Sequence, residues 1–247
     1  MRNYTLGPAL ETYGPNVRIL AILSAIALLF CWLSFAVAWE VRDRTAWIVF
    51  WSLTAGFAGI IAHYLTSRVW VHQLGLTYRG IFGYGEIRWL EVERFYFGSY
   101  EVHAHYFPLG TFHRLKLIST QGRKISFGEH VRHADELAAT IGKFTFEPLL
   151  QKALQKFNFG SGVDFGAIHM HPAEGLTIVK WYADKTIRWD ELQGYDVTTA
   201  YLKFHRFGKT FAWTVSAERV ANVPVLRALL DSVMGKVWQR VPQLTRR

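Results

Sequence analysis

The sequence predicts a two-helix transmembrane hairpin followed by two tandem domains of mixed α and β structure, each a bent antiparallel sheet capped by a C-terminal helix. Three features predict this fold. Two long apolar runs lie close together near the N-terminus, the chain after them has the pattern of short strands with occasional helices, and short motifs recur there 100 residues apart. With 51% hydrophobic and 19% charged residues, the composition suits a membrane protein with a soluble part and excludes a disordered chain.

The two apolar runs are long enough to cross a membrane. Residues 19–39 carry no charge over 21 positions, and eleven of these are Leu, Ile, Val or Phe. Residues 45–67 contain no Lys, Arg, Asp or Glu over 23 positions. Both match the ~20 residues that span about 30 Å of hydrocarbon, and the first exceeds the apolar segment of a cleaved signal peptide. We therefore expect two membrane-spanning helices.

A link of only five residues, 40–44, separates the runs, so the helices should be antiparallel neighbours with both chain ends on one side. From Arg68 to the C-terminus there are 24 basic and 16 acidic residues. The positive-inside rule therefore places both termini in the cytoplasm and the protein in the cytoplasmic (inner) membrane. Small residues of the second helix are expected to pack against the first. They are Ala55, Gly56, Gly59 and Ala62.

The chain after the hairpin contains a repeat. Gly-Leu-Thr at 75–77 recurs at 175–177, and Ile-Arg-Trp at 87–89 recurs at 187–189. Each copy continues through a basic hairpin turn and ends in an amphipathic helix. We therefore expect the tryptophans of the two Ile-Arg-Trp motifs to occupy equivalent positions, each buried against the closing helix of its own domain.

These patterns divide the chain into six parts. A helix beginning at Pro148 should link the two copies, because proline suits the first turn of a helix. The parts are an N-terminal cytoplasmic segment (1–16), the transmembrane hairpin (17–67), a first domain (69–145), a linker helix and loop (146–160), a second domain (161–240) and a basic tail (241–247).

Each half resembles the pleckstrin-homology-like (PH-like) domains of bacterial membrane proteins, which follow one or two transmembrane helices. The matching segments are GLTYRG with IRWLEVERF in the first half and GLTIVKW with IRWDELQGY in the second. The resemblance covers about residues 70–145 and 165–238. It implies a partly open β-barrel with a capping helix, in a family largely without assigned activity, and it supplies no catalytic residue.

No pattern in the sequence predicts catalysis or a cofactor. His103 with His105, and His169 with His171, place two imidazoles on one strand face, a spacing that metals use. No carboxylate or cysteine completes either set, so we expect no metal site and no enzyme activity. A metal-dependent enzyme that uses these histidines is the weakest alternative.

The favoured function is docking. Six aromatic residues within thirteen positions exceed what one face of a small barrel can bury, so some should form an exposed patch for other membrane-protein subunits. They are Phe95, Tyr96, Phe97, Tyr100, Tyr106 and Phe107. The protein is then a structural or accessory subunit of a larger integral-membrane complex, for example a respiratory, photosynthetic or transport complex.

The alternative is a module that senses lipid headgroups. Basic residues on or beside the two hairpin turns could meet anionic membrane lipids. They are Arg123, Lys124, Lys203, Arg206 and Lys209. Binding of nucleic acid is not expected, because the positive charges are scattered among Asp and Glu.

Overall fold

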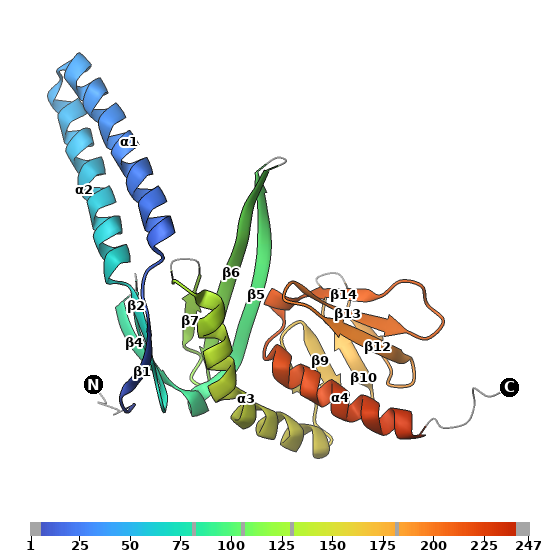
Figure 1. The fold of residues 1–247 in the computed structure, drawn as a ribbon. Helices are drawn as coiled ribbons and strands as arrows, with labels where there is room; N and C mark the ends of the chain where they lie inside the picture. Colours follow the sequence, from blue (N-terminus) through green and yellow to red (C-terminus); the bar gives the residue numbers. More distant parts are fainter. Residues whose placement is uncertain (1–5, 81–82, 105–106, 129–130, 181–182, 241–247) are drawn as a thin grey trace. The chain divides into compact units, whose positions relative to one another are not determined.

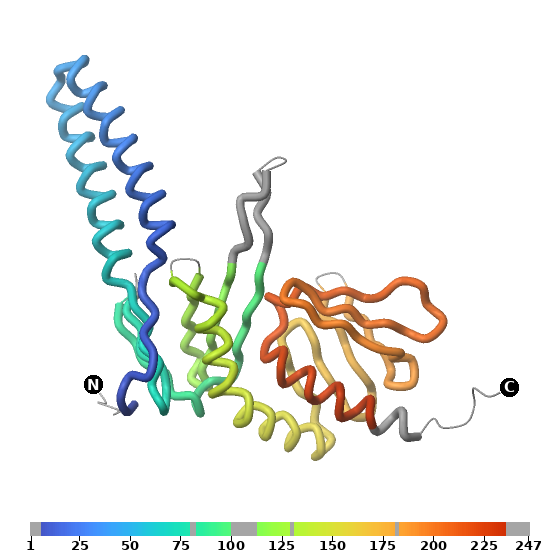
Figure 2. The backbone as a smooth tube through the Cα atoms, in the orientation of Figure 1, coloured from blue at the N-terminus to red at the C-terminus, as the bar shows by residue number. Residues whose placement is uncertain are grey.

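A computed structural model describes residues 6–80, 83–104, 107–128, 131–180 and 183–240, whose backbone is traced in Figure 2. They fall into two compact units. The first comprises Met1–Arg88 and Glu129–Ala134, and the second comprises Trp89–Gly128 and Asp135–Arg247. The predicted basic tail at 241–247 lies outside the described residues.

The first unit contains two helices that are long and apolar enough to cross a membrane, α1 (Val17–Val41) and α2 (Arg44–Thr66). Asn16 caps the start of α1, and the Asp43 carboxylate accepts a hydrogen bond from the Thr45 backbone N–H at 3.2 Å. Only Ala27 and Ala38 of these two helices are buried within the chain, whereas the core helices of a soluble domain would bury a whole face.

Aromatic side chains hold α1 against α2. The Phe35 ring lies edge-on to Trp47 at 5.8 Å and to Phe50 at 5.9 Å, and Phe30 stacks on Phe57 at 6.0 Å between ring centroids. The chain therefore forms the expected helical hairpin, but with large side chains between the helices.

The small residues of α2 do not pack against α1, so that prediction is wrong. A Cβ atom added at Gly56 or Gly59 would meet no atom within 4 Å, and Ala55 and Ala62 are exposed. The rings of the interface occupy the opposite side of α2, so the small residues face outward from the hairpin.

A four-stranded antiparallel sheet joins the two ends of the hairpin (Figure 1). Its strands, in spatial order, are β1 (Ala9–Tyr13), β2 (Arg68–His72), β3 (Gly75–Gly80) and β4 (Gly83–Arg88). β1 runs into α1 and pairs with β2, which follows α2, so that Tyr13 lies opposite Val69. The sequence predicted a separate segment at 1–16, whereas part of it is an edge strand of this sheet.

The second unit begins with a three-stranded sheet and a long helix. A 3₁₀ turn, η1 (Trp89–Glu91), precedes the sheet. The antiparallel strands, in order, are β5 (Val92–Ala104), β6 (Phe107–Ser119) and β7 (Lys124–Phe127), and the helix is α3 (Ala134–Asn158). The buried Leu115 and Leu117 flank the partly exposed Lys116, and the buried Ile125 and Phe127 flank the exposed Ser126, which is the alternation of a sheet covered on one face.

α3 is one helix, although the sequence predicted a closing helix and a separate linker helix that starts at Pro148. Pro148 lies inside α3, and Figure 1 shows the helix bending along its length. Proline removes a helical hydrogen bond, and the Thr145 hydroxyl donates to the Ile141 carbonyl at 2.8 Å, a bond that also bends helices. Continuous helix with a bend therefore replaces the predicted break.

The two halves of α3 enter two different cores. In its first half, Leu137 and Ile141 are fully buried, and Phe144 stacks on Trp89 at 5.3 Å with the ring planes 3° apart. In its second half, Leu149 and Ala153 belong to the hydrophobic core of the C-terminal strands. α3 thus ties both sheet systems of the second unit together.

Two further antiparallel sheets and a helix complete the second unit. One sheet has the order β11-β10-β9-β8 and the other β12-β13-β14, and they do not close into a barrel in the described part of the chain. The elements are β8 (Val163–Asp164), β9 (Ile168–His171), β10 (Gly175–Ile178), β11 (Lys185–Ile187), β12 (Leu192–Val197), β13 (Tyr201–Arg206), β14 (Trp213–Ser216) and α4 (Val223–Arg240). Leu226 and Leu230 of α4 are fully buried in the same core as Phe204.

The repeated motifs pair in the same register. Leu76 lies opposite Ile87 in one sheet, and Leu176 lies opposite Ile187 in another. A Cβ atom added at Gly75 would lie 3.0 Å from the Cα of Arg88, and one added at Gly175 would lie 2.8 Å from the Cα of Arg188. Both glycines therefore allow the same close approach of two strands.

The two tryptophans differ in their surroundings. Trp89 is buried on α3, as predicted. Trp189 is only partly buried, and the aromatic ring that it contacts is Phe157 of α3, edge-on at 6.3 Å, whereas the prediction placed it on its own closing helix, α4. Its indole N–H donates to the carbonyls of His171 and Pro172 at 3.1 and 3.0 Å. Both tryptophans therefore contact α3.

The glycine pair yields the first prediction. Gly75→Ala and Gly175→Ala should each lower the free energy of unfolding by about 1–3 kcal/mol, because the new methyl group overlaps backbone of the neighbouring strand. Gly175 has φ +112°, so its substitution adds strain of about 1–2 kcal/mol. Denaturant titration of the full chain in mild detergent measures both effects. Gly194→Ala is the control, because a Cβ there meets nothing within 4 Å; equal stability of all three variants would contradict the prediction.

Candidate functional site

The two faces of β5 lead to different surroundings. Side chains alternate along a strand, so Phe95 and Phe97 point to one face and Tyr96 to the other. Phe95 and Phe97 line a cavity together with α3. Tyr96 lines a second cavity on the opposite face, together with residues that flank the strands of the C-terminal sheets.

The first cavity is an apolar groove of about 790 Å³. Its walls come from β5, the first half of α3, the β12–β13 turn and the start of α4. The lining residues are Phe95, Phe97, Asp135, Ala138, Ala139, Gly142, Lys143, Phe146, Val197, Thr198, Thr199, Ala217, Val223 and Pro224. We call it the α3 groove.

Small residues form the α3 side of this groove. Ala138, Ala139 and Gly142 lie within one turn of the helix, and a Cβ atom added at Gly142 would meet no atom within 4 Å. The two charged lining residues, Asp135 and Lys143, are eight positions apart, which corresponds to about 12 Å along a helix. The groove is therefore apolar along its length and carries one acid and one base on the same helix.

The predicted docking aromatics separate into distinct roles. Phe95 is only 7% exposed, so it belongs to the core, where it also forms the back of the α3 groove. Phe97 is half-buried and stacks on His113 at 5.8 Å. Tyr96 has the Lys116 ammonium 5.4 Å above its ring. The side chains of Tyr100 and Phe107, and the whole of Tyr106, lie outside the described residues.

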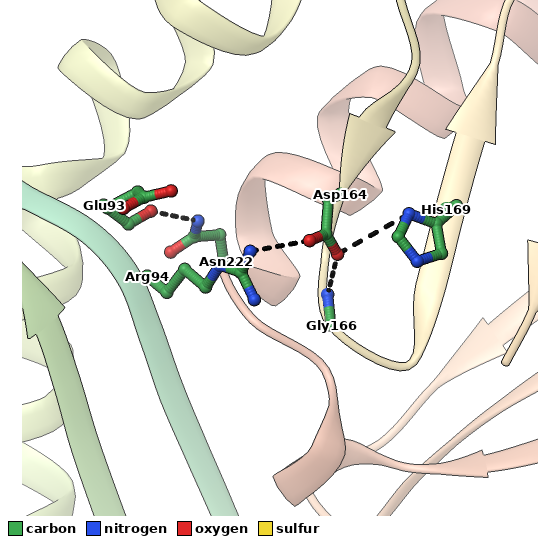
Figure 3. Close-up of polar contacts among 6 residues, drawn as sticks. All are labelled: Glu93, Arg94, Asp164, Gly166, His169 and Asn222. Atoms are coloured by element: carbon green, nitrogen blue, oxygen red, sulfur yellow. Dashed lines mark hydrogen bonds and ion pairs between the residues drawn. The ribbon is translucent and has the colours of Figure 1, made fainter. Parts of the chain in front are cut away.

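Asn222 joins β5 to the C-terminal half of the unit (Figure 3). β5 is an edge strand, and the buried Asn222 side chain satisfies that edge. Its Oδ1 accepts from the Phe95 N–H at 2.8 Å, and its Nδ2 donates to the Glu93 carbonyl at 3.0 Å. Its own backbone N–H donates to the Phe95 carbonyl at 2.6 Å. Asn222 was not predicted, because its position before Val223 indicates only an ordinary helix cap.

An ion pair reinforces this joint. The Arg94 guanidinium donates to the Asp164 carboxylate at 2.6 Å, and the same carboxylate accepts from the Gly166 N–H at 2.6 Å (Figure 3). His169 lies 3.6 Å from it. The pKa of Arg94 is raised above its ordinary value, chiefly by its hydrogen bond to Tyr96 and also by Asp164, against the opposing effect of burial. Arg94 therefore remains a cation at any physiological pH.

The residues predicted to meet lipid lie on two hairpins. Arg123 and Lys124 are exposed where β7 begins. On the β13–β14 hairpin, Arg206 stacks over the Trp213 ring at 3.9 Å and Lys203 lies over Tyr201 at 4.6 Å. Lys209 is exposed in the turn of that hairpin.

The predicted histidine pairs have ordinary polar partners where they are described. His171 accepts hydrogen bonds from the Ala173 and Glu174 N–H groups, both at 3.3 Å, and His169 neighbours Asp164. The His103 side chain and the whole of His105 lie outside the described residues. Across the described ranges, no three His, Cys, Asp or Glu side chains are grouped as a metal would require.

Asn222 carries the second prediction. Asn222→Ala should destabilise the chain by about 2–4 kcal/mol, because it leaves the buried Phe95 N–H without its acceptor (about 1–3 kcal/mol) and puts alanine at φ +51°. Asn222→Gly removes the same bonds without the backbone strain, so it should lose about 1 kcal/mol less. Denaturant titration of the full chain separates the cost of the lost hydrogen bonds from the cost of the backbone strain. Wild-type stability in both variants would show that Asn222 does not join the two halves.

Comparison with known proteins finds one family. Residues 1–238 match the family described as "Family of unknown function (DUF6585)". No curated protein matches the chain.

Proposed function

Because the chain belongs to the DUF6585 family of unknown function, we propose a function from its own geometry: a non-catalytic, membrane-anchored docking protein that serves as an accessory subunit of a larger integral-membrane complex. In this proposal α1 and α2 span the cytoplasmic membrane and both termini are cytoplasmic. The two halves after the hairpin are tandem PH-like domains. The element order supports this. The first half has three meandering strands that pair with β1 from before the hairpin, then three more strands and a helix, and the second half has four meandering strands, three more strands and a helix.

The α3 groove is the observation that carries the docking proposal. Aromatic, charge-poor surfaces are typical of the centres of protein interfaces. Ala138, Ala139 and Gly142 leave room for the backbone of a second helix, as small residues do wherever helices approach closely. We assign the groove an amphipathic helix of another membrane-protein subunit, held by its apolar face.

Two further features fit such a partner. Asp135 and Lys143 are exposed at separate points along the groove, so the partner helix should carry a base near the first and an acid near the second. In addition, the small residues of α2 face outward, where another transmembrane helix could approach closely.

Gly142 allows a test in which the groove is filled without disturbing the fold. Lys143 is replaced by a photo-crosslinking phenylalanine derivative in the full chain, which also carries Gly142→Trp or the control Gly142→Ala. The tryptophan occupies space that is open in the structure, so crosslinking to an integral-membrane subunit should fall by at least about fivefold, the loss of one interface anchor. Gly142→Ala should keep the crosslink.

The thermal midpoint of both Gly142 variants should equal that of wild type or exceed it, because glycine disfavours a helix by about 1 kcal/mol. Three results would sink the docking proposal: equal crosslinking by the two variants, crosslinks only to a second copy of the chain, or crosslinks only to soluble proteins.

The β13–β14 hairpin supports lipid contact as a second candidate function. Phe211 is 84% exposed and Phe207 54% exposed in its turn, beside the cations Lys203 and Lys209. Exposed rings next to basic side chains suit the boundary between lipid headgroups and acyl chains. This hairpin would then contact an anionic membrane surface.

A fluorophore tests the lipid candidate. Thr210→Cys, with Cys31 replaced, carries an environment-sensitive dye in protein reconstituted into vesicles. The dye emission should shift to the blue when phosphatidylglycerol replaces part of the phosphatidylcholine, because the basic turn is drawn to anionic headgroups. A dye on Ser161→Cys, near the 79% exposed Phe159, is the matched control and should not shift. Identical responses at both positions would rule out specific contact by the hairpin.

A further inference from the structure

The cavity on the other face of β5 is basic. It has a volume of about 400 Å³, and three of its lining side chains are Arg114, Lys116 and Arg219. The strand register places Lys116 directly opposite Tyr96, and Arg114 directly opposite Gly98. Because Arg114 and Lys116 are two positions apart on β6, both project from the same face of the sheet. We call this the basic cavity.

Close backbone contacts fix the far wall of the basic cavity. Arg219 belongs to the 3₁₀ turn η2 (Ala217–Arg219), and its carbonyl accepts from the Ala167 N–H at 3.0 Å. A Cβ atom added at Gly98 would lie 2.9 Å from the Cα of Glu218, and one at Gly166 would lie 2.8 Å from the Arg219 carbonyl oxygen. Glycine at both positions therefore lets η2 approach the sheet, and the cavity exists before any ligand arrives.

The charges in the basic cavity are unbalanced. Within the described residues, Arg114, Lys116 and Arg219 form no ion pair with a carboxylate, although Glu218 lines the same cavity. Three cations and one carboxylate give the lining a net charge of +2. Like charges held close together repel, and an anion placed among them would remove that repulsion.

We propose that the basic cavity binds a phosphate-bearing anion, either a phospholipid headgroup or a soluble phosphate compound. A phosphate monoester carries a charge of about −1.5 to −2 at pH 7, which matches the lining, and the phosphodiester of a phospholipid headgroup carries about −1, which offsets half of it. Guanidinium groups bind phosphate oxygens in bidentate pairs, and here two arginines from different elements, β6 and η2, line one cavity with a lysine. The site is separate from the α3 groove, because the sheet lies between them, and it does not depend on the docking function.

The test uses the full chain in nanodiscs and has two arms. In phosphatidylcholine nanodiscs, isothermal titration calorimetry with glycerol 3-phosphate and with inorganic phosphate detects a soluble ligand. In the second arm, phosphatidylglycerol replaces half of the lipid. If the lipid headgroup is the ligand, phosphatidylglycerol should raise the thermal midpoint and abolish titration by the soluble probes. If the ligand is soluble, titration should persist in both lipids.

Charge-matched variants decide whether the basic cavity is responsible. Arg114→Gln with Arg219→Gln should weaken phosphate binding, or reduce the stabilisation by phosphatidylglycerol, by at least about tenfold. The control Lys152→Gln with Lys156→Gln removes the same two charges from exposed positions of α3 and should keep binding within about twofold.

Glu218→Gln is expected to strengthen binding, and a variant that misfolds could not do so. It therefore separates a role in binding from a loss of structure. Removing the carboxylate from the cavity should tighten phosphate binding by roughly threefold to tenfold, because a like charge beside the anion is lost. The proposal is overturned if neither arm shows binding, if the two double variants lose binding equally, or if Glu218→Gln weakens it.

Discussion

Both candidate sites depend on the edge of β5 that does not pair with β6. An edge strand in a protein interior must find partners for its N–H and C=O groups, and here three of them bond to Asn222. That bonding fixes residues 217–224 against the sheet. Ala217, Val223 and Pro224 then form one end of the α3 groove, while Glu218 and Arg219 form a wall of the basic cavity. One asparagine thus positions a surface on each face of the same sheet.

The second unit is held together by a helix that contributes to two cores, as well as by the bonds of Asn222 to β5. α3 buries Leu137 and Ile141 in one core and Leu149 and Ala153 in the other. A helix that contributes to two cores cannot leave either without exposing apolar surface, which costs about 25 cal/mol per Å². The two sheet systems of this unit therefore form one cooperative body, which suits a protein that presents fixed surfaces to partners.

The sequence predicted best the elements that depend on local pattern. Membrane-length helices follow from charge-free runs, and the equal pairing of Leu76 and Leu176 follows from the repeated Gly-Leu-Thr and Ile-Arg-Trp motifs. β1 was not predicted, because its partner β2 is separated from it by the whole helical hairpin and no local pattern announces such a pairing. Pro148 was read as a helix start because its fixed φ suits both a first turn and a bent interior.

The candidate sites were harder to predict. The aromatics at 95–97 were identified, but only strand alternation in three dimensions separates Phe95 and Phe97 from Tyr96. The small residues of α3 were visible in the sequence, yet their meaning depends on an open space above Gly142. Arg114, Lys116 and Arg219 are scattered along the chain, and the approach of η2 to the sheet brings them to one cavity.

The pairing of β1 with β2 also links the helical hairpin to the order in which the chain is synthesised. The sheet of the first unit is interrupted after Tyr13 and resumes at Arg68, so its edge strand emerges from the ribosome before both helices and must wait for them. A chain in which only one helix had crossed the bilayer would hold β1 and β2 in different compartments. If α1 and α2 span the membrane as we propose, a molecule with only one helix inserted cannot complete this sheet, and it exposes an unpaired strand edge of the kind that aggregates or is degraded.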